Sequence, residues 1–344
     1  MSPPVSIWRW LAPMFAVTVT LIVASLLIIA LGKNPLVAFA ALVDGALAGP
    51  GLGNLQATIN RSAMIVGAAL AAGLALRSGF LNIGIEGQMV VGGVTAAITA
   101  QWLAGVPVLG LPAVLLCAAL AGGLWALCAG LMQLRLGIPL LISSLILNYP
   151  AIYLASWLVG HPFRDVTSGM AASPRVPAEL RLSPVAGTEI YLSAPIVLVL
   201  AVVMALFFRR MTLGYAARMA GMSPRFARAS GISVDRLGAY VVFASGAIAG
   251  LLGALAVLGE HHRYIDGMLV RPLYAWTGLM AVLLGGTGIP GLVAAGGFFA
   301  ALSTGAMGME RAADVPREIS RVLLACIILL VAARGSARLG GDKG

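Results

Sequence analysis

The stretch PIVLVLAVVMALFF, residues 195–208, decides the fold, and it ends at the charged pair Arg209 and Arg210. Its apolar residues follow one another without a break, so the run lacks the alternation of a membrane β-strand. Lipid admits only helices or closed barrels, and a helix needs roughly 20 mostly apolar residues to cross a hydrocarbon core of ~30 Å. The run therefore predicts a transmembrane helix near residues 191–209.

The whole chain repeats this pattern. Of its 344 residues, 60% are hydrophobic and 10% are charged, whereas an ordinary soluble domain has roughly 25% charged residues. This composition excludes a water-soluble fold and predicts an all-α integral membrane protein, with residues 1–334 as one transmembrane domain and 335–344 as a polar cytoplasmic tail. We expect about ten spans, near residues 11–31, 57–76, 83–102, 108–134, 139–159, 191–209, 236–258, 273–286, 290–308 and 318–333.

The charge distribution predicts the orientation. The formal net charge is +10, but a nucleic-acid partner would need a basic face on a soluble fold. Loops rich in arginine tend to stay in the cytoplasm, and the densest basic cluster lies at residues 209–236. We therefore place both termini and the loop 211–235 in the cytoplasm, and the loop 160–190 outside.

The inner loop contains helix signals. Ser223 can cap a helix that begins at Pro224, and Gly231 can close it in the left-handed conformation. A second short helix is expected over residues 214–220, with Gly221 as its stop. The two helices should project Tyr215, Arg218, Met219, Arg225, Phe226 and Arg228 into the cytoplasm. From charge alone, a solvated basic loop that holds lipid headgroups remains an alternative.

Four stretches carry a family resemblance. Residues 213–232, LGYAARMAGMSPRFARASGI, resemble the ATPase-contacting coupling loop of ABC importer permeases for simple sugars, nucleosides and branched-chain amino acids. Residues 79–89 (GFLNIGIEGQM), 147–149 (LNY) and 276–286 (WTGLMAVLLGG) resemble landmarks of the nucleoside-type branch, in the expected order. The chain length and the leading segment 34–56 resemble the longer of two paired permease paralogues.

This resemblance implies a permease subunit of an ATP-driven importer for nucleosides or related simple sugars, in a bacterial inner membrane. It implies three partners: a second permease chain, an ATP-binding subunit and an external solute-binding lipoprotein. The coupling residues would be Gly214, Tyr215, Arg218, Gly221, Pro224, Arg225, Phe226, Arg228 and Gly231. ATP and Mg²⁺ would belong to the ATPase, because this chain has only Lys33 and Lys343 and neither fits the phosphate-binding motif GxxxxGK[ST]. No cofactor is expected on the chain itself.

The candidate substrate-pathway residues are Asn82, Glu86, Gln88 and Asn148. Glu86 is the one carboxylate that the sequence places at a transmembrane helix, where a charge is costly and often marks a path or a buried pair. It also lies near the start of its helix, where the dipole favours a carboxylate and Asn82 could be the cap. Asn148 could contact a solute or join neighbouring helices. Both interpretations stay open for these residues.

Other features favour structural roles. Glycines at 246, 250 and 253, and at 285, 286, 288, 291, 296 and 297, permit hinges or close helix packing, and packing is the favoured purpose. Glu260, His261, His262 and Asp266 lack helical metal-ligand spacing, so this segment favours contact with an external binding protein over a metal site. No nucleophile and base are paired as catalysis requires. The chief alternative function is a secondary transporter or channel driven by an ion gradient. Such a protein needs carboxylates within the membrane to bind the coupling ion or proton, and Glu86 is the one candidate.

Overall fold

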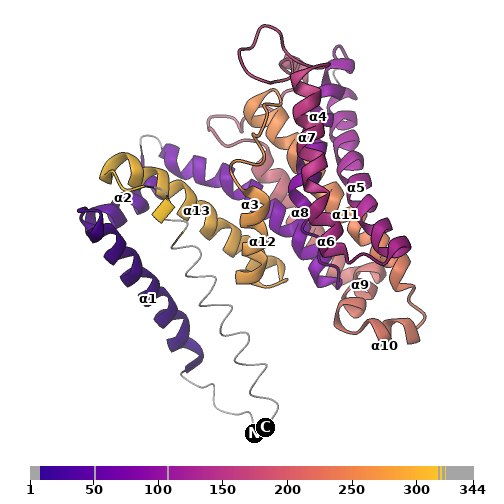
Figure 1. Cartoon of the computed structure of the whole chain (residues 1–344), viewed down its shortest axis with the longest axis horizontal. Helices are drawn as coiled ribbons and strands as arrows, with labels where there is room; N and C mark the ends of the chain where they lie inside the picture. The colour runs from indigo at the N-terminus through magenta and orange to yellow at the C-terminus, as the bar shows by residue number, and fades with distance from the viewer. Residues whose placement is uncertain (1–7, 50–51, 107, 317, 320–321, 323–344) are drawn as a thin grey trace. The chain divides into compact units, whose positions relative to one another are not determined.

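The computed structural model describes residues 8–49, 52–106, 108–316, 318–319 and 322 (Figure 1). Within these residues the regular structure is helical, accompanied by two isolated β-bridges, Ala172 to Ile265 and Pro184 to Tyr191. The helices are α1 (Trp8–Ala30), α2 (Pro35–Leu47), α3 (Gly53–Arg77), α4 (Ile85–Trp102), α5 (Gly110–Leu136), α6 (Leu140–Ile146), α7 (Asn148–Gly160), η2 (Ala178–Leu180), α8 (Ser193–Arg210), α9 (Thr212–Met222), α10 (Pro224–Ala229), α11 (Val234–Leu255), η3 (Ala256–His261), α12 (Tyr274–Gly285) and α13 (Ile289–Ala313).

The all-α membrane architecture is confirmed. Six helical segments in the described part of the chain are long and apolar enough to cross a membrane, and a bent pair of helices, α1 and α2, would make a seventh. Two of the expected spans, which correspond to α4 and α12, are not among these six segments. Helix α12 has 12 residues, which amounts to only ~18 Å of helix, and α4 carries Glu86 and Gln88 in its first turns. The expected span 318–333 lies mostly outside the described residues.

The chain divides into two compact units. Unit 1 contains residues 1–61 and 297–344, and unit 2 contains residues 62–296. In unit 1, α1 and α2 meet at an angle of 114°. Asn34 stabilises the start of α2 because its side chain accepts a hydrogen bond of 2.9 Å from the Leu36 amide. Lys33, in the same turn, forms a 2.6 Å ion pair with Asp314, which follows α13.

Glycines hold the core of unit 2 together. A Cβ on Gly122 of α5 would lie 2.7 Å from the Gly250 Cα of α11, and a Cβ on Gly253 of α11 would lie 2.7 Å from the Gly93 amide nitrogen of α4. Real Cβ atoms do not approach so closely, so α4, α5 and α11 make backbone contact that only glycine allows. Close packing is thus confirmed as the purpose of glycines 246, 250 and 253.

The later glycines have mixed purposes. Gly285 and Gly291 pack against each other's backbone across the turn between α12 and α13, and Gly296 packs on Val66 of α3. Gly286 has a φ of +71°, and neither it nor Gly288 has a neighbour within 4 Å of an added Cβ. These two glycines therefore serve the backbone of the turn, and the packing explanation is wrong for them.

The long loop after α7 is coil with one short helix, η2. Its backbone is bound to the segment that precedes α12: the Ser173 amide donates to the Tyr264 carbonyl at 2.9 Å, and the Val176 amide donates to the His262 carbonyl at 2.7 Å. Tyr264 is 1% exposed beneath it. The loop is therefore a fixed cover on one end of unit 2, although its place outside the cell stays a prediction.

Candidate functional site

The expected helix of the inner loop is confirmed in α10. The Ser223 hydroxyl accepts a hydrogen bond of 3.3 Å from the Phe226 amide, and Pro224 occupies the first turn, where its missing donor costs nothing. Gly231 then takes a φ of +83°, the left-handed conformation that ends a helix. The local sequence is therefore enough to define this helix.

Helix α9 is longer than expected. It runs from Thr212 to Met222, so the prediction that Gly221 ends it is wrong. Gly221 lies against the turn that follows α3, where an added Cβ would be 3.0 Å from the Gly79 amide nitrogen. Gly214 packs just as closely on the end of α8 at Phe207 and Phe208. Both glycines let α9 lie directly on the ends of two long helices.

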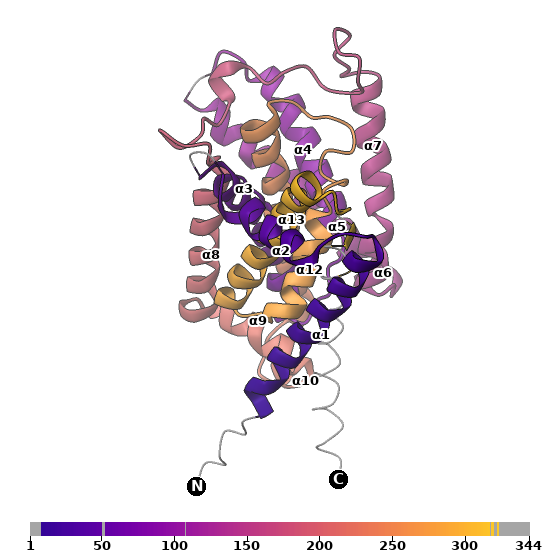
Figure 2. The same ribbon diagram turned by 90° about the vertical axis from the view of Figure 1, so that its left-hand side faces the viewer.

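The outer face of α9 and α10 is aromatic and basic. Figure 1 shows both helices at one end of unit 2, and Figure 2 shows the lower end of α8 beside α9. Tyr215 and Phe226 are each 58% exposed, and Arg225 is exposed as well. The exposed Arg228 approaches Asp235 to 3.9 Å. Exposed aromatic and arginine side chains are typical of protein interfaces, so this face can receive a partner.

Arg218 does not project outward as expected. It is half-buried, and its guanidinium donates a hydrogen bond to the Phe208 carbonyl at the end of α8. The last turn of a helix leaves such carbonyls without partners inside the helix. Arg218 therefore fastens α9 to α8, while Tyr215, Arg225, Phe226 and Arg228 form the exposed face.

Arg77, at the end of α3, extends this connection. Its guanidinium carbon lies 4.3 Å from the centre of the Phe208 ring, a cation–π contact. Its Nη1 donates a hydrogen bond of 3.4 Å to the Thr287 carbonyl in the turn before α13. We call Arg77, Phe208, Arg218, Gly221 and Thr287 the Arg77 junction. Through it, α9 contacts the ends of α3 and α8, and Arg77 links both to the turn between α12 and α13.

The pathway candidates lie in a second cluster, the buried amides around the break before α4. The Asn82 amide nitrogen donates to Gln88 Oε1 at 3.0 Å and to Ser245 Oγ at 2.9 Å, and Gln88 returns a bond of 3.0 Å to Asn82 Oδ1. Asn82 Oδ1 also accepts from the Gly84 amide at 3.0 Å. Helix α4 begins just after Gly84, so Gly84 and not Asn82 occupies the capping position.

Asn148 joins α7 to the same break. Its Oδ1 accepts from the Gly87 amide at 2.9 Å, and its amide donates to the Ile83 carbonyl at 3.3 Å. Ser144 Oγ accepts from the Ile83 amide at 3.1 Å. The side chains thus satisfy backbone groups that the irregular turn leaves unpaired. In this conformation Asn82, Gln88 and Asn148 bind protein, and their contact with a solute stays a prediction.

Glu86 lies in the first turn of α4 and is 8% exposed. Its side chain lies close to that of Trp276 of α12. The cavity beside it, lined by Asn82, Ile83, Ile85, Ala275, Trp276 and Leu279, has a volume of about 10 Å³, which is room for about one water molecule. Both the carboxylate and the break before α4 are therefore tightly enclosed here.

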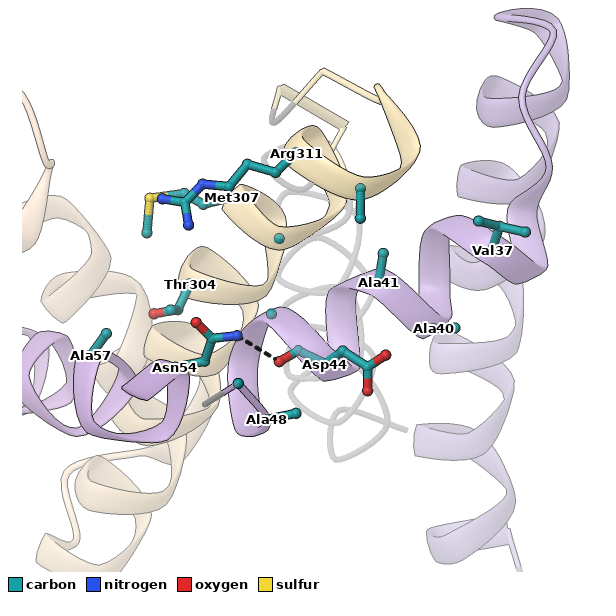
Figure 3. A pocket seen from close by; sticks show the side chains of 14 residues that line it. Val37, Ala40, Ala41, Asp44, Ala48, Asn54, Ala57, Thr304, Met307 and Arg311 are labelled. Atoms are coloured by element: carbon teal, nitrogen blue, oxygen red, sulfur yellow. Dashed lines mark hydrogen bonds between the residues drawn. The ribbon is translucent and has the colours of Figure 1, made fainter. Parts of the chain in front are cut away.

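Unit 1 contains a cavity beside polar groups, and the sequence analysis did not predict it. A cavity of about 790 Å³ lies between α2, the start of α3 and the end of α13 (Figure 3). Its lining includes Asp44, Asn54, Thr304 and Arg311, and the Asn54 amide donates to the Asp44 backbone carbonyl at 3.0 Å. Small-molecule sites usually have volumes of ~300–1,000 Å³. The cavity is large enough for a solute.

Asp44 is a second carboxylate within an apolar helix. The sequence analysis singled out Glu86 alone, whereas Asp44 lies inside α2, which is also apolar. The local signal was the pair Asp44 and Gly45 within an otherwise apolar stretch of sequence.

The segment with Glu260, His261, His262 and Asp266 is held by contacts within the protein. His262 Nδ1 lies 3.0 Å from the Leu258 carbonyl, and Asp266 accepts from Ser156 Oγ at 2.5 Å. No group of three metal-binding side chains gathers among the described residues.

Comparisons with known proteins agree with this architecture. A family profile described as "Branched-chain amino acid transport system / permease component" matches residues 54–332. The guanosine ABC transporter permease protein NupP of Bacillus subtilis is 28% identical, covering 95% of this chain and 94% of that protein. The nucleoside ABC transporter permease protein NupB of Lactococcus lactis is 25% identical, covering 94% and 91%.

A sugar permease is similar to the same extent. The glucose ABC transporter permease protein TsgB13 of Haloferax volcanii is 26% identical, covering 96% of this chain and 90% of that protein. The profile match spans most of the chain, and the apolar helices agree with a multi-pass membrane protein. This chain belongs to the family of branched-chain amino acid transport system permease components, whose members are transport subunits and not catalysts.

Proposed function

We propose that this chain is the permease subunit of an ATP-driven importer of nucleosides, and that a separate ATPase drives it through α9 and α10. The observation that carries the proposal is the Arg77 junction, which attaches an exposed aromatic and basic surface directly to the ends of membrane helices. The nucleoside class is supported by similarity to permeases named for guanosine and for nucleosides. A simple sugar is the next expected solute, by similarity to a permease named for glucose.

In this mechanism, the ATPase binds the face formed by Tyr215, Arg225, Phe226 and Arg228. Closure of the ATPase on ATP displaces α9, and Arg218 passes that displacement to α8 because it is bonded to the Phe208 carbonyl. Arg77 passes it to α3 and to the turn before α13. Alternation between outward-open and inward-open states then requires no chemistry on this chain, only movement of packed helices.

The assembly has further proposed parts. About ten segments lie in a bacterial inner membrane with both termini cytoplasmic, a second permease chain completes the path, and an external lipoprotein delivers the solute. The chain binds no cofactor, since ATP and Mg²⁺ are used by the ATPase.

The solute path has two proposed segments. Polar groups inside membrane proteins commonly line substrate routes, and the cavity of unit 1 places Asp44 and Arg311 beside open space. The break before α4, with Asn82, Glu86, Gln88 and Asn148, becomes a second contact if α4 moves during transport. A vesicle uptake assay tests each segment by its own variant, with the chain still folded: Asp44→Asn should raise KM for the solute if the cavity lines the path, and Gln88→Glu should raise it if the break before α4 does.

The docking proposal is tested by affinity purification of the native chain beside an Arg225→Glu/Arg228→Glu variant, with mass spectrometry of the retained proteins. Arg218 is left unchanged because its side chain is bonded within the permease. Arg135→Glu, at the exposed end of α5, is the matched charge control. We expect an ATPase with the native and control chains and its loss from the double variant. A native chain that never retains an ATPase would overturn the proposal.

Transport itself is tested in right-side-out vesicles prepared with and without internal ATP, with labelled guanosine or glucose added outside. ATP-dependent uptake that survives a protonophore supports the ATP-driven importer. Uptake that needs an ion gradient and no ATP would instead establish the secondary transporter.

A further inference from the structure

A second hollow of unit 2 lies on the surface between α8 and α11, and it is almost entirely apolar. It has a volume of about 280 Å³, and its lining includes Val203 and Phe207 of α8 and Tyr240 and Ala244 of α11. The side chains at its mouth face outward, since Val203 is 54% exposed and Tyr240 is 68% exposed. We call this hollow the α8–α11 groove. In a membrane-spanning segment, such a surface is in contact with lipid tails unless protein covers it.

The groove has the length of one lipid leaflet. On α11 it extends from Leu237 to Ile248, while on the other side it extends from Leu200 to Phe207 of α8 and on to Met211, which follows that helix. The interval of eleven residues on α11 corresponds to ~16 Å of helix at 1.5 Å per residue. Half of a hydrocarbon core of ~30 Å is ~15 Å. An acyl chain that enters at the α9 end can therefore lie along the groove to the middle of the membrane.

Basic side chains stand at one end of the groove. Arg210 follows Phe207 by three residues on α8, and Arg236 precedes Tyr240 by four residues on α11, so each lies on the same helix face as a lining residue. Both arginines are exposed. Tyr240 adds an aromatic ring of the kind found at membrane interfaces.

The charge at this end is strongly one-sided. Between Tyr191 and Ser245 the sequence contains six arginines and one acid, Asp235, which approaches Arg228. A neutral lipid would leave the arginines at the mouth of the groove without a complementary charge, whereas a lipid phosphate with a net negative headgroup would satisfy them.

We propose that the α8–α11 groove is a binding site for an anionic phospholipid of the leaflet on the α9 side. One acyl chain lies between Val203, Phe207 and Ala244, and the phosphate is held by Arg210 and Arg236. The site lies next to α9, which packs on the end of α8, so its occupant touches the helix ends that the Arg77 junction joins. The proposal does not depend on the solute or on ATP.

The test uses the full chain in detergent, with phosphatidylglycerol and phosphatidylcholine of identical acyl chains as probes, and reads bound lipid by native mass spectrometry. An Arg210→Gln/Arg236→Gln variant removes the charge, and Ala244→Trp fills the groove. Arg135→Gln is the control, because it removes an exposed arginine from the end of α5. All variants are first checked for a single elution peak and an unchanged melting temperature without added lipid.

We expect the native chain and the control to retain phosphatidylglycerol at least tenfold better than phosphatidylcholine. The double variant should lose that preference, and Ala244→Trp should lose retention of both lipids. Equal retention of the two lipids by the native chain would overturn the proposal, as would variants that bind like the native chain. If Tyr240→Cys is shielded from a thiol reagent by a partner subunit in lipid-free detergent, the groove is a protein interface and the lipid site is refuted.

Discussion

Replacement of Arg77 by glutamine tests whether the Arg77 junction transmits movement. The variant loses the cation–π contact with Phe208, worth ~0.5–2 kcal/mol. It also loses a long hydrogen bond of 3.4 Å to the Thr287 carbonyl, worth about 1 kcal/mol. Together these contacts amount to ~1.5–3 kcal/mol, or about a 10-fold to 150-fold weaker link between α3, α8 and the turn before α13.

Arg77 lies beneath α9 and not on its exposed face, so the ATPase should still bind with native affinity. We therefore expect ATP hydrolysis to continue while solute uptake falls at least fivefold, which lowers the number of solute molecules moved per ATP. The assay is parallel measurement of hydrolysis and uptake in proteoliposomes that contain the complete transporter, with Arg135→Gln as the control.

Two outcomes would refute the reasoning. A native ratio of uptake to hydrolysis in Arg77→Gln would show that the junction does not couple the two processes. Loss of ATPase binding in the same variant would show that Arg77 maintains the docking surface and does not transmit movement. Arg77→Lys separates charge from geometry, because lysine keeps the charge but lacks the planar group that stacks on Phe208 and reaches Thr287.

Three further changes test the packing and the amide cluster. Gly250→Leu should abolish the single elution peak in detergent, because the added Cβ alone would overlap α5 and overpacking costs ~1–3 kcal/mol or more. The control is Gly160→Leu: an added Cβ there has no neighbour within 4 Å, so this variant should elute as the native chain does. Asn82→Leu should lower the melting temperature by leaving Gln88 with a buried amide unpaired, at ~1–3 kcal/mol, and a native melting curve would contradict the network. Ser223→Ala should weaken α10 by ~1 kcal/mol and reduce ATPase affinity severalfold in a titration, without a change in the melting temperature of the permease.

The sequence alone predicts the elements whose signals are local. The run before Arg209 becomes α8, and the pair Ser223 and Pro224 with Gly231 becomes α10, because an apolar stretch or a cap depends on neighbours in the chain. Helix α12 ends at Gly285, beside Gly286 with its φ of +71°, close to the expected bounds 273–286. The expected span 139–159 omitted the break between α6 and α7 at Leu147, although Pro150 in the first turn of α7 is a local signal for such a break.

Side-chain direction was harder to predict than helix position. Arg218 shares its helix with the exposed Tyr215, yet it turns onto the end of α8 because unpaired carbonyls lie there. Gly221 looked like a helix stop because glycine often is one, but its role is set by the turn after α3, which is distant in sequence. The cavity of unit 1 was missed for the same reason, since Asp44 and Arg311 come from opposite ends of the chain.

The glycine contacts among α4, α5 and α11 also define what can serve as a fixed reference frame. Where backbone touches backbone, no rotamer can change to absorb a displacement, so these three helices must shift together or separate altogether. Spin labels placed on exposed positions of two of these helices, such as Leu131 of α5 and Tyr240 of α11, should report one unchanging separation throughout the transport cycle. Distances from this frame to labels elsewhere in the chain would then isolate the segments that move.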